Sequence, residues 1–222
     1  MPLAVPDVDR LFTVGSTYPY PNGQIGTVVD LPSVELDLPT GRVFACDPFV
    51  GLYEEAVAFT TSVAPGTYTV AVSMVEITDP ARPSTGHPHH RVAAARLRVL
   101  DRPVAAWEPG LTDGQDIVEL EGDGFYGYGV DAGTGCFVDV AVAGALAAYQ
   151  DESDALMDAL DGGGEQRILA LVTDPDTGHS VALFPSGWGD GAYPTWIGRT
   201  AGGEVACFVT EFFVVPDECT KN

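Results

Sequence analysis

Apolar and polar residues alternate with a period of two over two long stretches in the first half of the chain. Thr67 to Val75 places an apolar side chain at every second position, and Arg91 to Leu100 does nearly the same. This alternation is typical of a strand with one buried face. Prolines and a glycine interrupt residues 78–90. The pattern therefore predicts an antiparallel pair of strands joined by a long hairpin loop.

Shorter apolar runs predict further strands on both sides of this pair. Val43 to Cys46 reads as a strand that ends at Pro48, because proline cannot donate a hydrogen bond to a ladder. Arg167 to Thr173 and Val181 to Phe184 flank a turn, and Tyr193 to Ile197 is expected to pair with residues 204–215.

Helical patterns occur only after Trp107. Phe137 to Tyr149 follows Thr134 as a plausible cap, and Ala155 to Leu160 follows Ser153 and precedes three glycines. The predicted fold class is α+β and β-rich, with antiparallel sheets in a sandwich-like arrangement and a short helical insertion around residues 136–160.

The length and composition are those of one globular domain. The chain has 222 residues, 45% of them hydrophobic, and we find no internal repeat and no linker. We therefore expect a single domain over residues 1–222. Residues 1–40 are rich in proline, glycine and aspartate, and are expected to pack irregularly on the body with short strands.

The charge balance is strongly acidic, with a formal net charge of -22. This charge disfavours a general attraction to nucleic acid and to an anionic membrane. No stretch approaches the roughly 18 apolar residues of a membrane span. Residues 1–7 lack the basic and apolar regions of a signal peptide, so we expect a cytoplasmic protein. The excess of acid reflects either the composition of the source organism or a basic partner.

Four cysteines are spread widely through the chain, at Cys46, Cys136, Cys207 and Cys219. Their spacing matches no pattern of paired metal ligands. In a reducing compartment they are expected to be free thiols, with Cys46 and Cys207 inside apolar strands.

Two glycine-rich segments, residues 127–136 and 186–193, each set one aspartate among glycines. Glycine adopts a positive φ without steric cost, so both segments should form sharply shaped loops, where binding sites are often built. Gly-Asp-Gly is also an ordinary turn sequence. The sequence leaves open whether Asp131 and Asp190 are site residues or turn residues.

The first loop is also expected to begin a helix. With Thr134 as the cap of a helix from Phe137, the backbone N–H groups of Gly133, Thr134 and Gly135 would form an anion site at the positive end of the helix dipole. We therefore expect these three residues to bind a ligand.

The second loop supplies the candidates for catalysis. Asp131 and Asp190 are expected to share one pocket, as an acid/base pair or as oxygen ligands for a divalent cation. Aromatic side chains beside Asp190 would wall this pocket and raise the pKa of the aspartate. The neighbouring candidates are Ser186, Trp188, Gly191 and Tyr193.

Two more charged residues are candidates outside the loops. Glu108 follows Trp107 near the expected end of a strand, and either reaches the site or is a solvated residue beside a core tryptophan. Arg96 lies with Arg98 on one face of a strand, as part of a surface salt-bridge ladder or as an anion clamp.

Two other motifs are better explained without a ligand. Residues 87–90 hold three histidines around a proline, which is a weak and adventitious metal site in a loop. Residues 174–178 have the start of a calcium loop but lack its closing acidic residue, so a hairpin turn is the better interpretation.

The same motifs carry a resemblance over about 170 residues. The chain resembles DUF4241, a bacterial family of unknown function, whose closing strand more often has Asp-Phe where this chain has Glu211-Phe212. The matching motifs are Cys46-Asp47-Pro48, Pro65-Gly66-Thr67-Tyr68, Gly129 to Phe137 with Asp139, Ser186 to Tyr193, and Thr210-Glu211-Phe212. The resemblance implies no particular activity.

Two hypotheses about function follow from the sequence. The first is a small-ligand-binding protein or enzyme, which uses an Asp/Gly-loop pocket for acid/base or cation-assisted hydrolysis or group transfer on a small polar substrate. The second is a non-catalytic immunity- or inhibitor-type protein whose acidic surface binds a basic protein.

Overall fold

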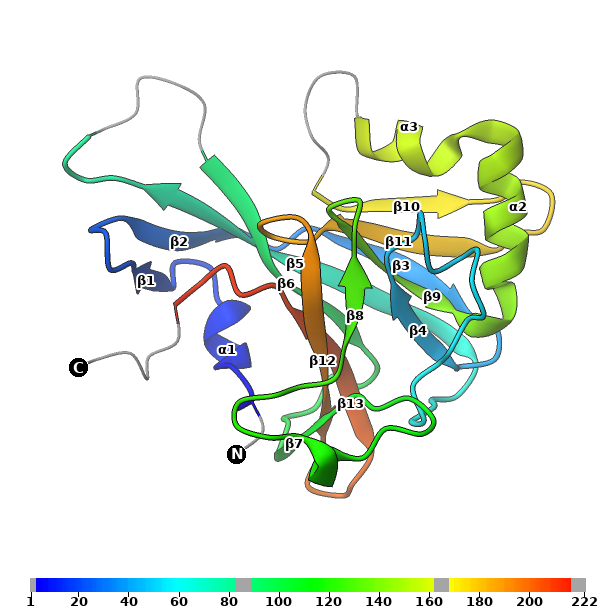
Figure 1. The fold of residues 1–222 in the computed structure, drawn as a ribbon, viewed down its shortest axis with the longest axis horizontal. Coiled ribbons are helices and arrows are strands. Elements are labelled where there is room, and N and C mark those ends of the chain that lie inside the picture. The colour runs from blue at the N-terminus through cyan, green and yellow to red at the C-terminus, as the bar shows by residue number, and fades with distance from the viewer. Residues whose placement is uncertain (1–2, 83–88, 162–167, 217–222) are drawn as a thin grey trace.

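The computed structural model describes residues 3–82, 89–161 and 168–216, and these residues form two antiparallel β-sheets (Figure 1). The large sheet contains nine strands: β1 (Thr17–Pro19), β2 (Ile25–Asp30), β3 (Ser33–Leu38), β5 (Gly66–Thr78), β6 (His89–Arg98), β7 (Ala106–Pro109), β8 (Gly127–Val130), β12 (Gly191–Arg199) and β13 (Val205–Glu211). The small sheet contains four: β4 (Val43–Cys46), β9 (Thr134–Asp139), β10 (Ala170–Thr173) and β11 (Ser180–Pro185). The β-rich fold class expected from the sequence is confirmed.

The strand order also matches most of the expected pairings. The large sheet runs β1-β2-β5-β6-β13-β12-β7, with β3 beside β5 and β8 beside β12, and the small sheet runs β10-β11-β9-β4. The expected hairpins β5–β6, β10–β11 and β12–β13 are all present. Residues 83–88 of the first hairpin lie outside the described residues.

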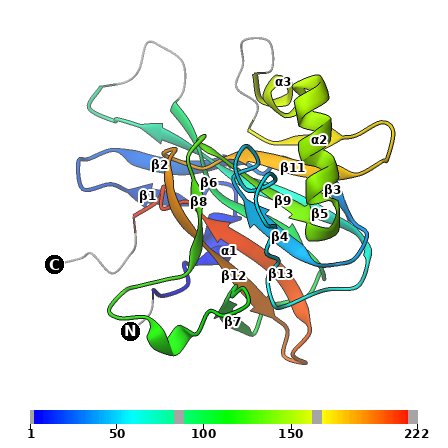
Figure 2. The same cartoon turned by 45° about the vertical axis from the view of Figure 1, so that its right-hand side comes forward.

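The small sheet is covered on both faces. Its Ala45, Phe137 and Phe184 belong to the core shared with the large sheet. Its Val138 and Leu183 belong to a second core with α2 (Ala143–Ser153) and α3 (Ala155–Asp161). Figure 2 shows the resulting layers, with α2 and α3 on the outer side of the small sheet.

Residues 134–139 form strand β9, so the prediction of a helix that begins at Phe137 is wrong. All six residues of β9 are buried, because the strand is covered on both faces. A strand buried on both sides reads as a continuous apolar run and loses the alternation that would identify it. The helical segment begins only after Asp139, whose carboxylate accepts a hydrogen bond from the Ala141 N–H.

The helices that follow are short. The longer, α2, has 11 residues and ends at Asp154, which has a left-handed backbone conformation. The expected helix at residues 155–160 is present as α3. No helix in the described part of the chain is long and apolar enough to cross a membrane.

The N-terminal segment packs against the large sheet through α1 (Val8–Leu11). Val8 and Leu11 are buried, and the carbonyl oxygen of Leu11 accepts a hydrogen bond from the buried Ser73 hydroxyl at 2.5 Å. The segment then continues into β1, β2 and β3. It therefore contributes strands and core residues to the body.

One aromatic cluster connects the two sheets. Phe184, on β11 of the small sheet, lies with its ring centroid 5.3 Å from that of Phe137 and 5.9 Å from that of Phe212, which follows β13. All three side chains are fully buried. We therefore expect the two sheets to unfold together.

We predict that Phe184→Ala lowers the free energy of unfolding by about 3–5 kcal/mol, because it removes a buried ring and leaves a cavity. Urea denaturation followed by tryptophan fluorescence and by far-UV circular dichroism should show one shared transition. Val118→Ala, at a side chain that is 85% exposed, should change stability by less than about 0.5 kcal/mol. Two separate transitions would contradict the expectation of a single domain.

Candidate functional site

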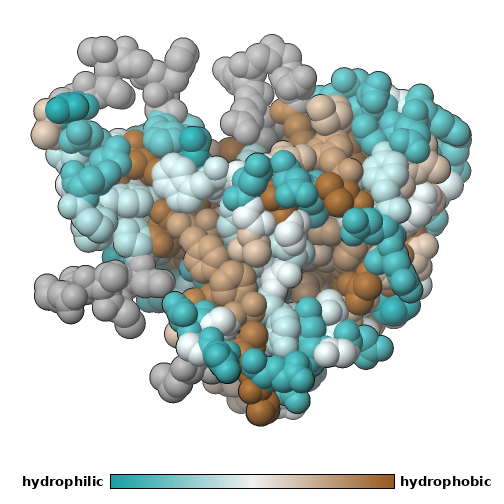
Figure 3. All heavy atoms as spheres, in the orientation of Figure 1, coloured by the Kyte–Doolittle hydropathy of each residue, from teal (hydrophilic) through white to brown (hydrophobic). Residues whose placement is uncertain are grey.

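A pocket of about 440 Å³ opens where the small sheet meets β8 and β12 of the large sheet. Its walls come from the end of β4, from residues 50–59 that follow it, from residues 110–115 after β7, and from β8. Figure 3 shows this face of the molecule, with apolar side chains near its centre and hydrophilic side chains around them. The pocket has the size of a small-molecule site.

The carboxylate of Asp47 fixes one side of the pocket. One of its oxygens accepts hydrogen bonds from the N–H groups of Asp131 and Ala132, at 2.9 and 2.7 Å, and the other accepts from Phe49 at 2.9 Å. The side chain is buried. Asp47 therefore ties the end of β4 to the loop after β8, and its charge is compensated by three N–H donors.

The turn after Asp47 closes over the thiol of Cys46. The Gly51 N–H donates to the Asp47 carbonyl at 2.7 Å. A Cβ atom at Gly51 would lie 2.5 Å from the Cβ of Cys46, so only glycine permits this close approach. Cys46 consequently lies beneath the turn, at the wall of the pocket.

Aromatic and hydroxyl groups form the rest of the wall. The rings of Phe44, Phe59 and Tyr128 line the pocket together with Thr195. The Thr195 hydroxyl lies 2.8 Å from that of Thr210, in a buried pair. Burial raises the pKa of Tyr128 well above its usual value, so its phenol is neutral at neutral pH.

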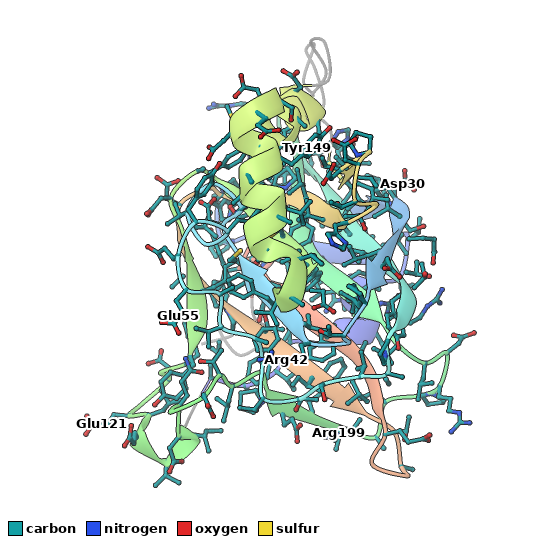
Figure 4. The ribbon with its side chains drawn as sticks, turned by 90° about the vertical axis from the view of Figure 1, so that its right-hand side faces the viewer. Asp30, Arg42, Glu55, Glu121, Tyr149 and Arg199 are labelled. Atoms are coloured by element: carbon teal, nitrogen blue, oxygen red, sulfur yellow. The ribbon has the colours of Figure 1, made fainter. Side chains whose placement is uncertain are left out.

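Three further carboxylates lie at the pocket, on Glu54, Glu55 and Asp131. Their residues are exposed, and no hydrogen bond or ion pair to these three carboxylates occurs within the described part of the chain. Figure 4 shows Glu55 on the segment after β4, well separated from Arg199. None of the described residues that line the pocket is basic. The pocket is therefore strongly acidic.

The two glycine-rich loops lie against each other, as the sequence suggested. The Ser186 N–H donates to the Gly133 carbonyl at 3.0 Å. Strands β8 and β12 pair up to Val130 and Gly191, so Asp131 and Asp190 stand opposite each other one step beyond the ladder. Asp131 lines the pocket, whereas the exposed Asp190 is not among its lining residues.

The helix N-terminus on which the expected anion site at Gly133, Thr134 and Gly135 depended is absent. Residues 134–139 are a strand, so there is no helix N-terminus here and no helix dipole. Thr134 and Gly135 are buried, and a Cβ atom at Gly135 would lie 2.7 Å from the Tyr128 hydroxyl. Gly133 has a φ of 65° and serves the tight turn between β8 and β9.

Two candidates of the second loop stabilise its shape. The Ser186 hydroxyl donates to the Gly189 carbonyl at 2.8 Å, and the Tyr193 hydroxyl donates to the same oxygen at 2.7 Å. Ser186 and Tyr193 are both buried. Gly189 has a φ of 110°, a conformation that glycine adopts without strain.

Trp188 and Gly191 lie outside the pocket wall. Trp188 is 53% exposed, and its ring is approached by the Arg91 guanidinium at 5.3 Å and by the His89 ring at 5.9 Å. Gly191 is the first residue of β12 and pairs with Val130. Trp188 therefore contacts β6, on another side of the loop.

Glu108 and Arg96 are engaged elsewhere. Glu108, on β7, accepts hydrogen bonds from the Arg199 guanidinium at 2.6 and 2.8 Å. Arg96, on β6, stacks on the ring of Phe12 at 4.1 Å, and burial lowers the pKa of its guanidinium. Neither residue lines the pocket.

The remaining motifs fit the interpretations without a ligand. The Asp174 carboxylate accepts from the Asp176 N–H and the Thr177 hydroxyl inside the β10–β11 hairpin. His90 contacts Glu76 across the β5–β6 ladder at 3.3 Å, and His87 lies outside the described residues. Among the described residues, no group of three histidines, cysteines, aspartates or glutamates could hold a metal ion.

The sequence did not identify Asp47, Glu54 and Glu55 as site residues. Asp47 stands in the Cys-Asp-Pro motif, which was the available signal for its role. The two glutamates lie in an irregular segment with no motif. Only the fold brings these residues to Asp131, which is 76 positions or more away along the chain.

The fold and the pocket define a β-rich protein of two antiparallel sheets with an acidic cavity at their junction. A family model described as a protein of unknown function, DUF4241, matches residues 36–210, and the chain belongs to this family. Neither the search of curated proteins nor the search of solved structures found a match.

We predict that Asp47→Ala lowers the free energy of unfolding by about 3 kcal/mol, because three backbone N–H groups lose a charged acceptor. The matched variant Asp131→Ala removes an exposed carboxylate and should change stability by less than about 0.5 kcal/mol. Urea denaturation of both variants measures the difference. Equal stability of the two variants would show that the hydrogen bonds of the Asp47 carboxylate do not stabilise the fold.

Proposed function

We propose that this protein binds a small organic cation in the acidic pocket, as a ligand-binding protein or as an enzyme acting on that ligand. The observation that carries the proposal is the charge of the wall: four carboxylates line it and none of the described lining residues is basic. Asp47 is compensated by N–H donors, which leaves Glu54, Glu55 and Asp131 to face a ligand.

The aromatic wall supports the same class of ligand. The rings of Phe44, Phe59 and Tyr128 line the pocket beside the carboxylates. Aromatic faces attract ammonium and guanidinium groups by about 0.5–2 kcal/mol each, more when water is excluded. A cation with an apolar stem would be complementary to both kinds of wall.

The pocket also places a group capable of acid/base chemistry, Asp131, beside the proposed ligand. Asp131 lines the pocket, and the hydrogen bond from its N–H to the Asp47 carboxylate holds its backbone in place. A carboxylate in this position would accept the proton of a water molecule that attacks the bound ligand. For a reaction that transfers a proton, we propose Asp131 as the general base.

A second function is favoured by the net charge of -22. A basic protein could place a lysine or arginine side chain in the same pocket, with the acidic surface guiding its approach. This is the inhibitor-type alternative. The two functions differ in the size of the ligand. A small cation alone should bind with measurable affinity only if the pocket is a small-molecule site.

We predict that a small organic cation raises the melting temperature saturably, with agmatine, putrescine and choline as probes and sodium phosphate at equal ionic strength as the blank. The double variant Glu54→Gln/Glu55→Gln should weaken the binding of the effective probe about tenfold, because two attractive charges are lost.

The control for net charge is the double variant Glu121→Gln/Glu152→Gln. It makes the same change in charge at exposed residues that do not line the pocket. It should leave the affinity within about twofold of the wild type. Equal weakening by both double variants would indicate general charge attraction and contradict a specific pocket.

We further predict that Asp131→Asn weakens binding of the same probe about tenfold, whereas Asp190→Asn changes it less than about twofold. The reason is that Asp131 lines the pocket and Asp190 does not. Isothermal titration of the two variants makes the comparison. A larger effect of Asp190→Asn would instead support a site shared by the two loops.

A further inference from the structure

Two cysteines that are 90 positions apart in the sequence meet below the wall of the pocket. Cys46 ends β4 and pairs in register with Cys136 on β9. Their Sγ atoms lie 3.4 Å apart, and both side chains are buried. We propose that Cys46 and Cys136 form a reversible disulfide, made by exchange with a small disulfide that enters through the pocket.

The backbone geometry is suitable for this bond. Directly opposed residues of an antiparallel pair have Cα atoms about 4.5–5.5 Å apart. A disulfide spans Cα separations of about 4.4–6.8 Å. The sulfurs need to approach by only about 1.4 Å to reach the bonded distance of about 2.04 Å. Rotation of the two side chains supplies a movement of this size without a shift of the strands.

Access differs between the two thiols. Cys46 is 5% exposed and lines the pocket, whereas Cys136 is fully buried and does not line it. Cys46 is therefore the thiol that an incoming disulfide meets first. Cys136 can react only with the Cys46 sulfur, after that sulfur has formed a mixed disulfide with the small thiol.

The exchange takes place in two steps. The Cys46 thiol loses its proton and attacks one sulfur of the incoming disulfide, whose S–S bond breaks, and the first small thiol leaves with a proton. Cys136 then loses its proton and attacks the Cys46 sulfur, and the second small thiol leaves with a proton. Two cysteine thiols are oxidised, and one small disulfide is reduced to two thiols.

The surroundings of Cys46 determine its rate and its preferred oxidant. The contact with Cys136 and burial raise the pKa of Cys46 well above its usual value, and Asp47 and Glu54 add to this effect. Few thiolates are present at neutral pH, so the exchange is slow. The acidic wall repels anionic disulfides and attracts cationic ones.

Cys207 provides an internal comparison. It is buried in β13, and the raised pKa of about 11 arises mainly from burial. It is not among the residues that line the pocket. Oxidation through the pocket should therefore leave Cys207 as a thiol.

The test uses the full chain, reduced, freed of reductant and incubated with cystamine, a cationic disulfide. Remaining thiols are alkylated before digestion with trypsin and mass spectrometry. Cys46 and Cys136 fall on the separate peptides 43–91 and 99–167. Cys207 falls on peptide 200–221 together with Cys219, and fragmentation of that peptide reads the two cysteines separately. We expect a linked pair of the first two peptides, its loss on treatment with dithiothreitol, and an alkylated Cys207.

The anionic 3,3′-dithiodipropionate tests the route of access. At low salt it should form the same bond at least about tenfold more slowly than cystamine. Equal rates would contradict entry through the acidic pocket. Because the bond is read directly on the wild-type chain, this test is independent of whether any organic cation binds reversibly.

Two results would overturn the disulfide itself. One is full alkylation of Cys46 and Cys136 after prolonged exposure to excess cystamine. The other is a stable adduct on Cys46 with no link to Cys136, provided that the protein remains folded by circular dichroism. The variant Cys136→Ser should stop at that adduct, and Cys207→Ser should form the link as the wild type does.

Discussion

The hydrogen bonds of the Asp47 carboxylate hold together the ends of two ladders that belong to different sheets. Cys46, one residue earlier, ends the β4–β9 ladder, and Asp131 follows the β8–β12 ladder. A buried carboxylate is stable only when hydrogen bonds replace its hydration, and three N–H groups do so here. The shape of the pocket between the two ladders depends on this contact.

The acidic residues of the family motifs therefore have two different roles. Asp47 and Asp139 are buried and bind backbone N–H groups, so their charges stabilise the fold. Asp131, with Glu54 and Glu55, keeps its carboxylate at the open pocket. Folding thus separates carboxylates that look alike in the sequence, because only burial and available donors distinguish a structural charge from one that can meet a ligand.

The sequence predicted the strands that bury one face, such as residues 67–75, because alternation survives there. It failed at β9, where both faces are covered and glycine and cysteine sit among the apolar residues. It also predicted that the two glycine-rich loops face each other, as the Ser186–Gly133 hydrogen bond shows. Two contacts could not be predicted from the sequence: the pairing of Cys46 with Cys136, and the hydrogen bonds of Asp47 to the loop after β8. Both depend on how strands that are far apart in the chain come together.

The acidic pocket is the proposed binding site of a small organic cation. The most direct measurement is an amide NMR titration of the isotope-labelled protein with agmatine, with shifts mapped onto the described residues. We expect saturable shifts at residues 44–59 and 127–132, including the Asp131 and Ala132 amides, which donate to Asp47. Saturable shifts confined to other surfaces, such as the Trp188 loop and β6, would contradict it.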